Sequence, residues 1–124
     1  MQIPIFVLVL GFAIACDIYD VVMTEKGIRA GVGVEGNTWL VGTKPTALKL
    51  YLRDSLVLAM TVAPSIFAAL IGRPELFYGF LIGPFVFGVK HIQGGRQWRW
   101  ALNNPTKKLP EPGSAWQQFL GTWV

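Results

Sequence analysis

An uncharged apolar stretch that runs directly into two aspartates constrains this chain more than any other feature. Residues 3–16 carry no charge, and Asp17 and Asp20 follow in the same predicted helix. A carboxylate inside a lipid-spanning helix is costly unless it is partnered, and it usually faces protein or a water-filled cavity. Asp17, Asp20 and Thr24 share one face of that helix. We therefore expect this face to meet a partner elsewhere in the chain.

The composition is that of a membrane domain. Of the 124 residues, 52% are hydrophobic and only 15% are charged, which is too apolar for an ordinary soluble domain of this size. A single Cys and a single His exclude an intramolecular disulfide, a zinc finger and a CxxCH haem site. No nucleophile–base pair or phosphate-binding loop is visible, so we expect no enzymatic activity and no cofactor, with bound lipids as the only small-molecule ligands.

The chain is predicted to be an all-α membrane protein with three transmembrane helices and an interfacial amphipathic C-terminal tail. The helices are expected at about residues 3–28, 46–71 and 75–91, within a transmembrane domain of residues 1–92. Thr46 is a suitable N-cap for the second helix, and Pro74 suits the first turn of the third. Because no Lys or Arg precedes the first apolar run, we expect a retained span and not a cleaved signal.

Residues 93–124 are expected to form an aromatic and basic tail at the membrane–water boundary. Apolar residues recur there at helical spacing from Trp116 to Trp123, which predicts an amphipathic helix that lies on the membrane or docks into a partner. Indole and guanidinium groups suit the headgroup layer. The predicted interfacial anchors are Trp39, Arg96, Trp98, Arg99, Trp100, Trp116, Phe119 and Trp123.

The basic residues predict the orientation in the membrane. With three spans, the first loop and the tail lie on the same side of the membrane. Arg73 is the only flanking cation expected on the other side. The cations on the side of the loop and tail are Lys26, Arg29, Lys44, Lys90, Arg96, Arg99, Lys107 and Lys108. Cytoplasmic flanks are rich in Lys and Arg, so we expect the N-terminus outside and the C-terminus in the cytoplasm. The expected location is a bacterial inner membrane, with a viral membrane as the alternative. This distribution suits topology and not a nucleic-acid groove, so we expect no nucleic-acid partner.

The two acids of the first helix are expected to pair with bases of the second. At 1.5 Å per residue, Asp20 and Arg53 lie at similar depth from their shared loop, which predicts an ion pair between them. Asp17 would lie about a turn deeper and accept hydrogen bonds from Arg53, Tyr19, Tyr51 or Ser55. Lys49 would lie about a turn shallower, near Thr24. The predicted intramembrane charge cluster is Asp17, Asp20, Lys49 and Arg53.

This cluster has two interpretations. In the first, it only fixes the register of two helices, because carboxylates around one guanidinium satisfy one another. In the second, it is a cation or proton site, since neighbouring acids in membranes mark relays in transporters. Too few helices argue against the second, because three helices enclose no pathway without further copies of the chain.

Several residues are predicted to face partners. Asp54 is left over by the pairing and would meet either Lys90 or a neighbouring subunit. Gly79 and Gly83 are spaced for close helix–helix contact. Small residues on the first two helices could match them: Gly11, Ala15, Ala59 and Ala63. We expect the first two helices to form the rigid core and the third helix and tail to meet partners.

Two residues with reactive side chains are expected to have structural roles. His91 is expected to be a hydrogen-bonding residue near the membrane surface and not a metal ligand or base. Cys16 is expected to pack as a small apolar side chain, because lipid surroundings disfavour its thiolate.

An aspartate, Thr24, a glycine at 31 or 33, and Glu35-x-Asn37 follow one another before the second apolar helix. From about Asp17 to Ala63, this pattern resembles an uncharacterised family of small bacterial multi-span membrane proteins. This chain has Thr38 where the family pattern has proline. The resemblance implies topology and no activity. Glu35 and Asn37 are expected to bond loop amides.

These features together predict a membrane protein that acts by association, as an accessory or structural subunit of a larger membrane complex. Its partners would be other membrane-protein subunits or copies of itself, together with lipids. A self-assembling pore former is the alternative, because three spans and a basic tail are similar to the topology of phage holins. A second alternative is a small oligomer that conducts ions or protons.

Overall fold

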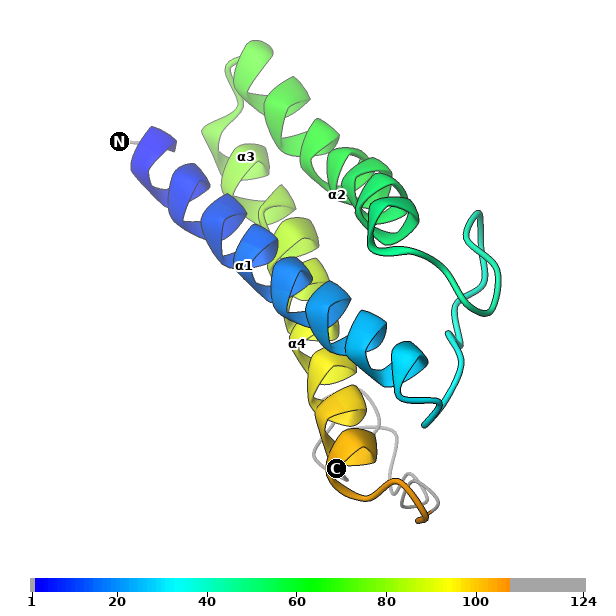
Figure 1. Cartoon of the computed structure of the whole chain (residues 1–124). Helices are drawn as coiled ribbons and strands as arrows, with labels where there is room; N and C mark the ends of the chain where they lie inside the picture. Colours follow the sequence, from blue (N-terminus) through cyan, green and yellow to red (C-terminus); the bar gives the residue numbers. More distant parts are fainter. Residues whose placement is uncertain (1, 108–124) are drawn as a thin grey trace.

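The computed structural model describes residues 2–107, and this part of the chain is helical without any strand. Four helices follow one another: α1 (Gln2–Arg29), α2 (Ala47–Leu70), α3 (Pro74–Phe80) and α4 (Ile82–Asn103). Figure 1 shows that the loop after α1 and the C-terminal end of α4 lie toward one end, whereas the N-terminus and the α2–α3 connection lie at the other. The expected all-helical fold is confirmed for these residues.

Two of the helices support a helical membrane protein. The segments Ile3–Arg29 and Ala47–Leu70 are long and apolar enough to cross a membrane. Only 22% of the most apolar part of the first and 28% of that of the second is buried, whereas the core helix of a soluble protein is mostly buried. A third span is not shown, because neither α3 nor α4 meets the same test of length and composition.

The ends of α2 have simple local causes. Thr46 caps its N-terminus by accepting a hydrogen bond from the backbone N–H of Lys49 at 3.4 Å, as the sequence predicts. Gly72 follows its C-terminus with φ +70°, a conformation that glycine adopts without strain. Pro74 then begins α3, where the side chains of Arg73 and Glu75 form an exposed ion pair.

The prediction of a single helix over residues 75–91 is wrong. The helix is interrupted at Leu81, and Pro84 lies in the first turn of α4. Proline has no N–H for the carbonyl four residues earlier and its ring crowds that carbonyl, which favours a break at this point. Helix α4 then continues past His91 to Asn103, so residues 93–103 extend the helix and do not begin a separate tail.

Helix α1 packs more extensively on α4 than on α2. A Cβ atom on Gly88 would lie 2.6 Å from the Phe12 ring and 3.2 Å from Ala13 Cα, and one on Gly95 would overlap the Tyr19 ring. Glycine thus lets the two helices approach closely. The expectation that the first two helices form the rigid core is therefore wrong, because the tightest pairing joins α1 to α4.

Helix α2 is held near its two ends by small apolar clusters. Leu50 packs with Val21 of α1 and with Val41 of the loop. At the other end, Ala68 packs with Phe77 and Leu81, and Phe6 of α1 lies against them. Between helices in lipid, such clusters stabilise the packing through van der Waals contact.

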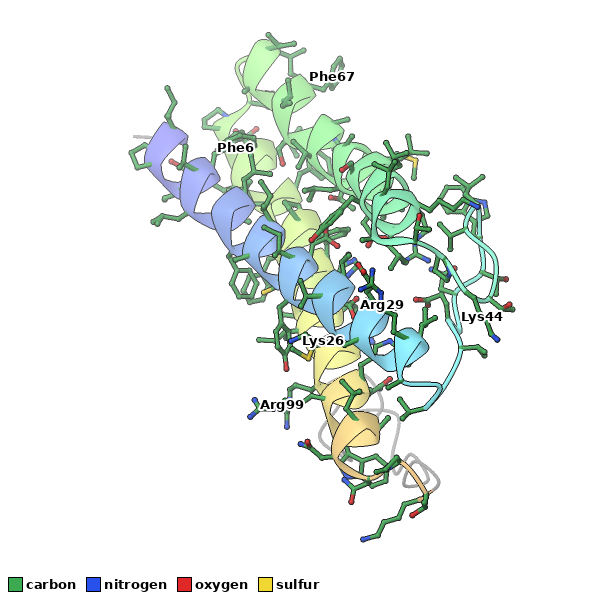
Figure 2. The ribbon with its side chains drawn as sticks, viewed as in Figure 1. Phe6, Lys26, Arg29, Lys44, Phe67 and Arg99 are labelled. Atoms are coloured by element: carbon green, nitrogen blue, oxygen red, sulfur yellow. The ribbon has the colours of Figure 1, made fainter. Side chains whose placement is uncertain are left out.

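The labelled side chains of Figure 2 show how charge is distributed along the molecule. Phe6 and Phe67 lie toward the end that carries the N-terminus, and Lys26, Arg29, Lys44 and Arg99 lie toward the other. This separation has the form that the orientation prediction assumes. The direction of insertion stays a prediction.

Candidate functional site

Five charged or titratable side chains from three helices meet between α1, α2 and α4. We refer to them as the charged cluster: Asp17 and Asp20 of α1, Arg53 and Asp54 of α2, and His91 of α4. Asp17, Arg53 and Asp54 are buried, with residue exposures of 8%, 6% and 2%. Buried charges are tolerated when they are paired, so the contacts of each member decide what the cluster can do.

His91 bonds to Asp20 of α1 and lies near Asp17. Its Nδ1 atom lies 2.7 Å from Asp20 Oδ2 and 3.5 Å from Asp17 Oδ1. The Phe87 ring lies against the imidazole at a centroid distance of 4.2 Å. Thr24 donates to Asp20 Oδ1 at 3.4 Å, which keeps Asp20 in the stripe that the sequence predicts. The expected hydrogen-bonding role of His91 is confirmed, with Asp20 as its partner.

Arg53 does not pair with Asp20, and that prediction is wrong. Its Nε atom donates to Asp54 Oδ1 at 2.8 Å, and its Nη1 atom donates to the Asn37 carbonyl at 2.6 Å. The guanidinium therefore links α2 to the loop. Asp54, which was expected to meet Lys90 or a neighbouring subunit, is buried inside the chain beside Arg53.

Glycines of α4 explain why His91, and not Arg53, reaches Asp20. A Cβ atom on Gly94 would lie 2.8 Å from Asp20 Oδ1, and one on Gly95 would lie 3.3 Å from Asp20 Cα. Only glycine allows α4 this close to the acid. Sequence reasoning missed the role of these residues, although Gly88 and Gly95 recur seven residues apart on one helix face.

Two carboxylate oxygens of the cluster lack a hydrogen-bond donor in the described part of the chain. They are Asp17 Oδ1 and Asp54 Oδ2, and both are fully buried. One potential metal-ligand atom from each of Asp17, Asp54 and His91 lies within 4.8 Å of the other two. Their geometry therefore brings two carboxylates and an imidazole to one point, where they could hold a cation.

The loop between α1 and α2 is organised by Glu35 and Asn37. Glu35 Oε1 accepts from the Asn37 N–H at 2.9 Å, and Asn37 Oδ1 accepts from the Trp39 N–H at 3.4 Å. The expected bonding of loop amides by these two residues is confirmed. Burial raises the pKa of the Glu35 carboxyl, although the Asn37 N–H and Arg53 oppose this shift.

A cavity of about 370 Å³ lies between this loop and α4, and we refer to it as the loop cavity. Asp20, Glu35, Asn37, Gln97 and Trp98 contribute to its lining. It joins the polar loop to the Asp20 end of the charged cluster. Trp98 also packs over Gly27 and Gly33, so this predicted interfacial anchor also closes the α1–α4 contact.

Two grooves reach the cluster at the level of the apolar helices. The α1–α2 groove, of about 580 Å³, is lined by apolar side chains and by Asp17, Tyr51 and Ser55. The α2–α4 groove, of about 510 Å³, is lined by residues that include His91, Lys90 and Gly83. Tyr51 and Ser55 were expected to lie near Asp17, and all three residues line this one groove.

The remaining predicted site residues are placed as follows. Lys49 is exposed and lies outside the cluster. Gly79 is exposed, and a Cβ atom added to it would have no neighbour within 4 Å, whereas Gly83 packs against the Thr61 carbonyl inside the chain. Trp39 is half exposed, and Arg96, Arg99 and Trp100 line a shallow surface pocket. Trp116, Phe119 and Trp123 lie outside the described residues.

Small residues of the first two helices do not form the expected matches with Gly79. A Cβ atom added to Gly11 would likewise have no neighbour within 4 Å, and Ala59 and Ala63 are exposed. Cys16 is buried as a free thiol, in keeping with its expected packing role.

Comparison of the chain with protein-family models, curated proteins and solved structures finds no match.

Proposed function

We propose that this protein is an integral membrane component that acts by association, as an accessory or structural subunit of a larger membrane complex. The observation that carries this proposal is the α1–α2 groove, whose apolar walls contain the polar side chains of Asp17, Tyr51 and Ser55. Lipid chains offer no hydrogen bonds to such groups. A transmembrane helix with a polar side chain at the same depth suits the groove better than lipid does.

The wall of the groove is shaped for close approach. Ala59 lines it and is exposed on α2, and small exposed residues let a second helix backbone come near. Helix α2 contacts α1 far less than α4 does, and none of residues 2–107 fills the groove between α1 and α2. A helix of another subunit, or of a second copy, is the occupant that we propose.

The experiment compares two tryptophan substitutions on exposed alanines of α2. Ala59→Trp would fill the groove, whereas the control Ala69→Trp lies outside it. We expect stoichiometric partners or further copies to co-purify in mild detergent with the unchanged chain and the control, and to be lost with Ala59→Trp. A clean monomer for the unchanged chain in detergent and in nanodiscs would contradict the proposal.

A second candidate function is a small ion- or proton-conducting oligomer. The observation that favours it is that the charged cluster is reached from several sides: the loop cavity touches Asp20, the α1–α2 groove touches Asp17 and the α2–α4 groove touches His91. Ion flux into liposomes that contain the purified protein would test it. Entry of a large dye into cells on induction would instead indicate the holin-like pore former.

A further inference from the structure

We propose that Asp17, Asp54 and His91 bind one divalent transition-metal ion. The donor atoms of these three side chains lie within 4.8 Å of one another and come from three different helices, α1, α2 and α4. Two carboxylate oxygens and one imidazole nitrogen form a ligand set that suits Mn²⁺, Fe²⁺ or Zn²⁺. Only the assembled fold brings them together.

The orphaned oxygens give an independent reason to place an ion there. The Asp54 side chain is only 3% exposed, and its Oδ2 atom has no hydrogen-bond donor in the described residues. Asp17 Oδ1 is also buried and has no hydrogen-bond donor among the described residues. A buried acceptor without a partner is destabilising, and more so when it is charged. One ion between the two carboxylates would satisfy both oxygens.

The charge of the cluster selects a divalent ion. Three aspartates face one arginine, so with all three carboxyls ionised and the His91 imidazole neutral, the five side chains carry a formal charge of −2. A monovalent ion would leave one negative charge in a region of low dielectric, where uncompensated charge is costly. A divalent ion neutralises the cluster.

The two remaining members of the cluster are placed to support the ligands. Arg53 Nε holds Asp54 through Oδ1, which leaves Oδ2 for the ion. Asp20 holds the His91 ring at 2.7 Å. Metal-binding imidazoles commonly bond a carboxylate in this way, because the bond fixes the ring and its tautomer. Here Nδ1 donates to Asp20, so Nε2 is the nitrogen with a free lone pair for the ion.

The loop cavity brings a polar lining up to the supporting residue Asp20. Asp20 and Glu35 line it together with the uncharged polar groups of Asn37 and Gln97. A cation that enters this cavity meets the carboxyl groups of Glu35 and Asp20, and Asp20 in turn holds the ligand His91. The site thus has ligand atoms from three helices and supporting contacts that hold them, which are features expected of a metal site.

The test uses the full chain, stripped with a chelator and reconstituted in nanodiscs. Isothermal titration with Mn²⁺ and Zn²⁺ should show one ion per chain, with Mg²⁺ bound at least tenfold more weakly, because Mg²⁺ prefers an all-oxygen octahedral site. Asp17→Asn and Asp54→Asn should each lower the affinity for Mn²⁺ or Zn²⁺ at least tenfold. The control Glu75→Gln removes an exposed acid outside the cluster and should leave the affinity unchanged.

A second readout covers variants that fail to fold. Binding to the native state raises the midpoint of thermal unfolding with ion concentration, so Mn²⁺ or Zn²⁺ should stabilise the unchanged chain and Glu75→Gln alike. Absence of binding and of any thermal shift in the unchanged chain would overturn the proposal. So would equal affinity in a folded Asp54→Asn variant.

Discussion

His91 Nδ1 lies 2.7 Å from Asp20 Oδ2 and so joins the middle of α4 to the polar end of α1. The two residues are 71 positions apart in the sequence, and no feature of either helix alone would place them together. Because Gly94 and Gly95 permit the approach, this contact is part of the same interface that makes α1 and α4 the most closely packed pair.

A double-mutant cycle on this pair should show coupling. Asp20→Asn removes the carboxylate charge from the bond and His91→Gln removes the imidazole, so the second substitution should cost less in the background of the first. We expect a coupling free energy of about 1–3 kcal/mol, as for hydrogen bonds that involve a charged group. Unfolding in mixed micelles measures it. The matched cycle of Asp20→Asn with Glu75→Gln should be additive, and additivity of the His91 cycle would show that the bond is absent.

Loss of the Arg53 guanidinium should be strongly destabilising. Arg53→Gln leaves Asp54 buried without its partner and removes the bond to the Asn37 carbonyl. Breaking a buried ion pair from one side costs about 3–5 kcal/mol, and adding Asp54→Asn should recover part of that loss. The exposed Lys49→Gln variant serves as the control and should change the free energy of unfolding by less than about 0.5 kcal/mol. An equal effect of the two single variants would contradict the arrangement.

The α1–α4 interface should not tolerate a methyl group at its glycines. Gly88→Ala and Gly95→Ala place a Cβ atom against Phe12 and Tyr19, and such overpacking costs about 1–3 kcal/mol. Gly79→Ala has open space at the same position and should be neutral or slightly stabilising, because alanine favours helix more than glycine does. Thermal unfolding in detergent ranks the three variants. Equal midpoints for all three would mean that the interface is not close packed.

Two glutamates outside the spans should give pH dependences of opposite sign. Burial raises the pKa of Glu35, so its contribution to stability is present below the ordinary glutamate pKa of about 4.3 and is lost as pH rises through the folded value. The Arg73 side chain lowers the pKa of Glu75, so its contribution is present above the ordinary pKa and is lost as pH falls.

The measurement for this pair is the free energy of unfolding against pH for the unchanged chain, Glu35→Gln and Glu75→Gln. The advantage of the unchanged chain over Glu35→Gln should decrease as pH rises above the ordinary glutamate pKa. Its advantage over Glu75→Gln should increase as pH rises toward that value. Curves that run in parallel would refute the opposite environments of the two carboxyls.

Local signals in the sequence were enough to locate the two long apolar helices and their loop. An uncharged run identifies α1, the Thr46 cap and Gly72 delimit α2, and Glu35 and Asn37 fix the loop through short-range bonds. Each of these depends on residues a few positions apart. Such interactions are the ones that propensity and capping rules describe.

The pairing within the charged cluster could not be derived in the same way. The rise per residue gives the depth of Asp20 and Arg53, but it does not say which helix turns toward the acid. That choice depends on how closely α4 approaches α1, which the glycines of α4 decide across a long sequence separation. Gly94-Gly95 also resembles a helix end when read locally, so the continuation of α4 to Asn103 was missed.

The most direct test of the account is the pairing of α1 with α4 in the native membrane. Phe12 and Phe85 stack at a centroid distance of 5.5 Å across this interface, and both are partly exposed. In a Cys16→Ser background, the F12C/F85C variant should be cross-linked within one chain by a short thiol reagent in carbonate-washed membranes, and the control F12C/F67C should not. Cross-linking of the control in place of F12C/F85C, or recovery of the protein in the soluble fraction, would contradict the account.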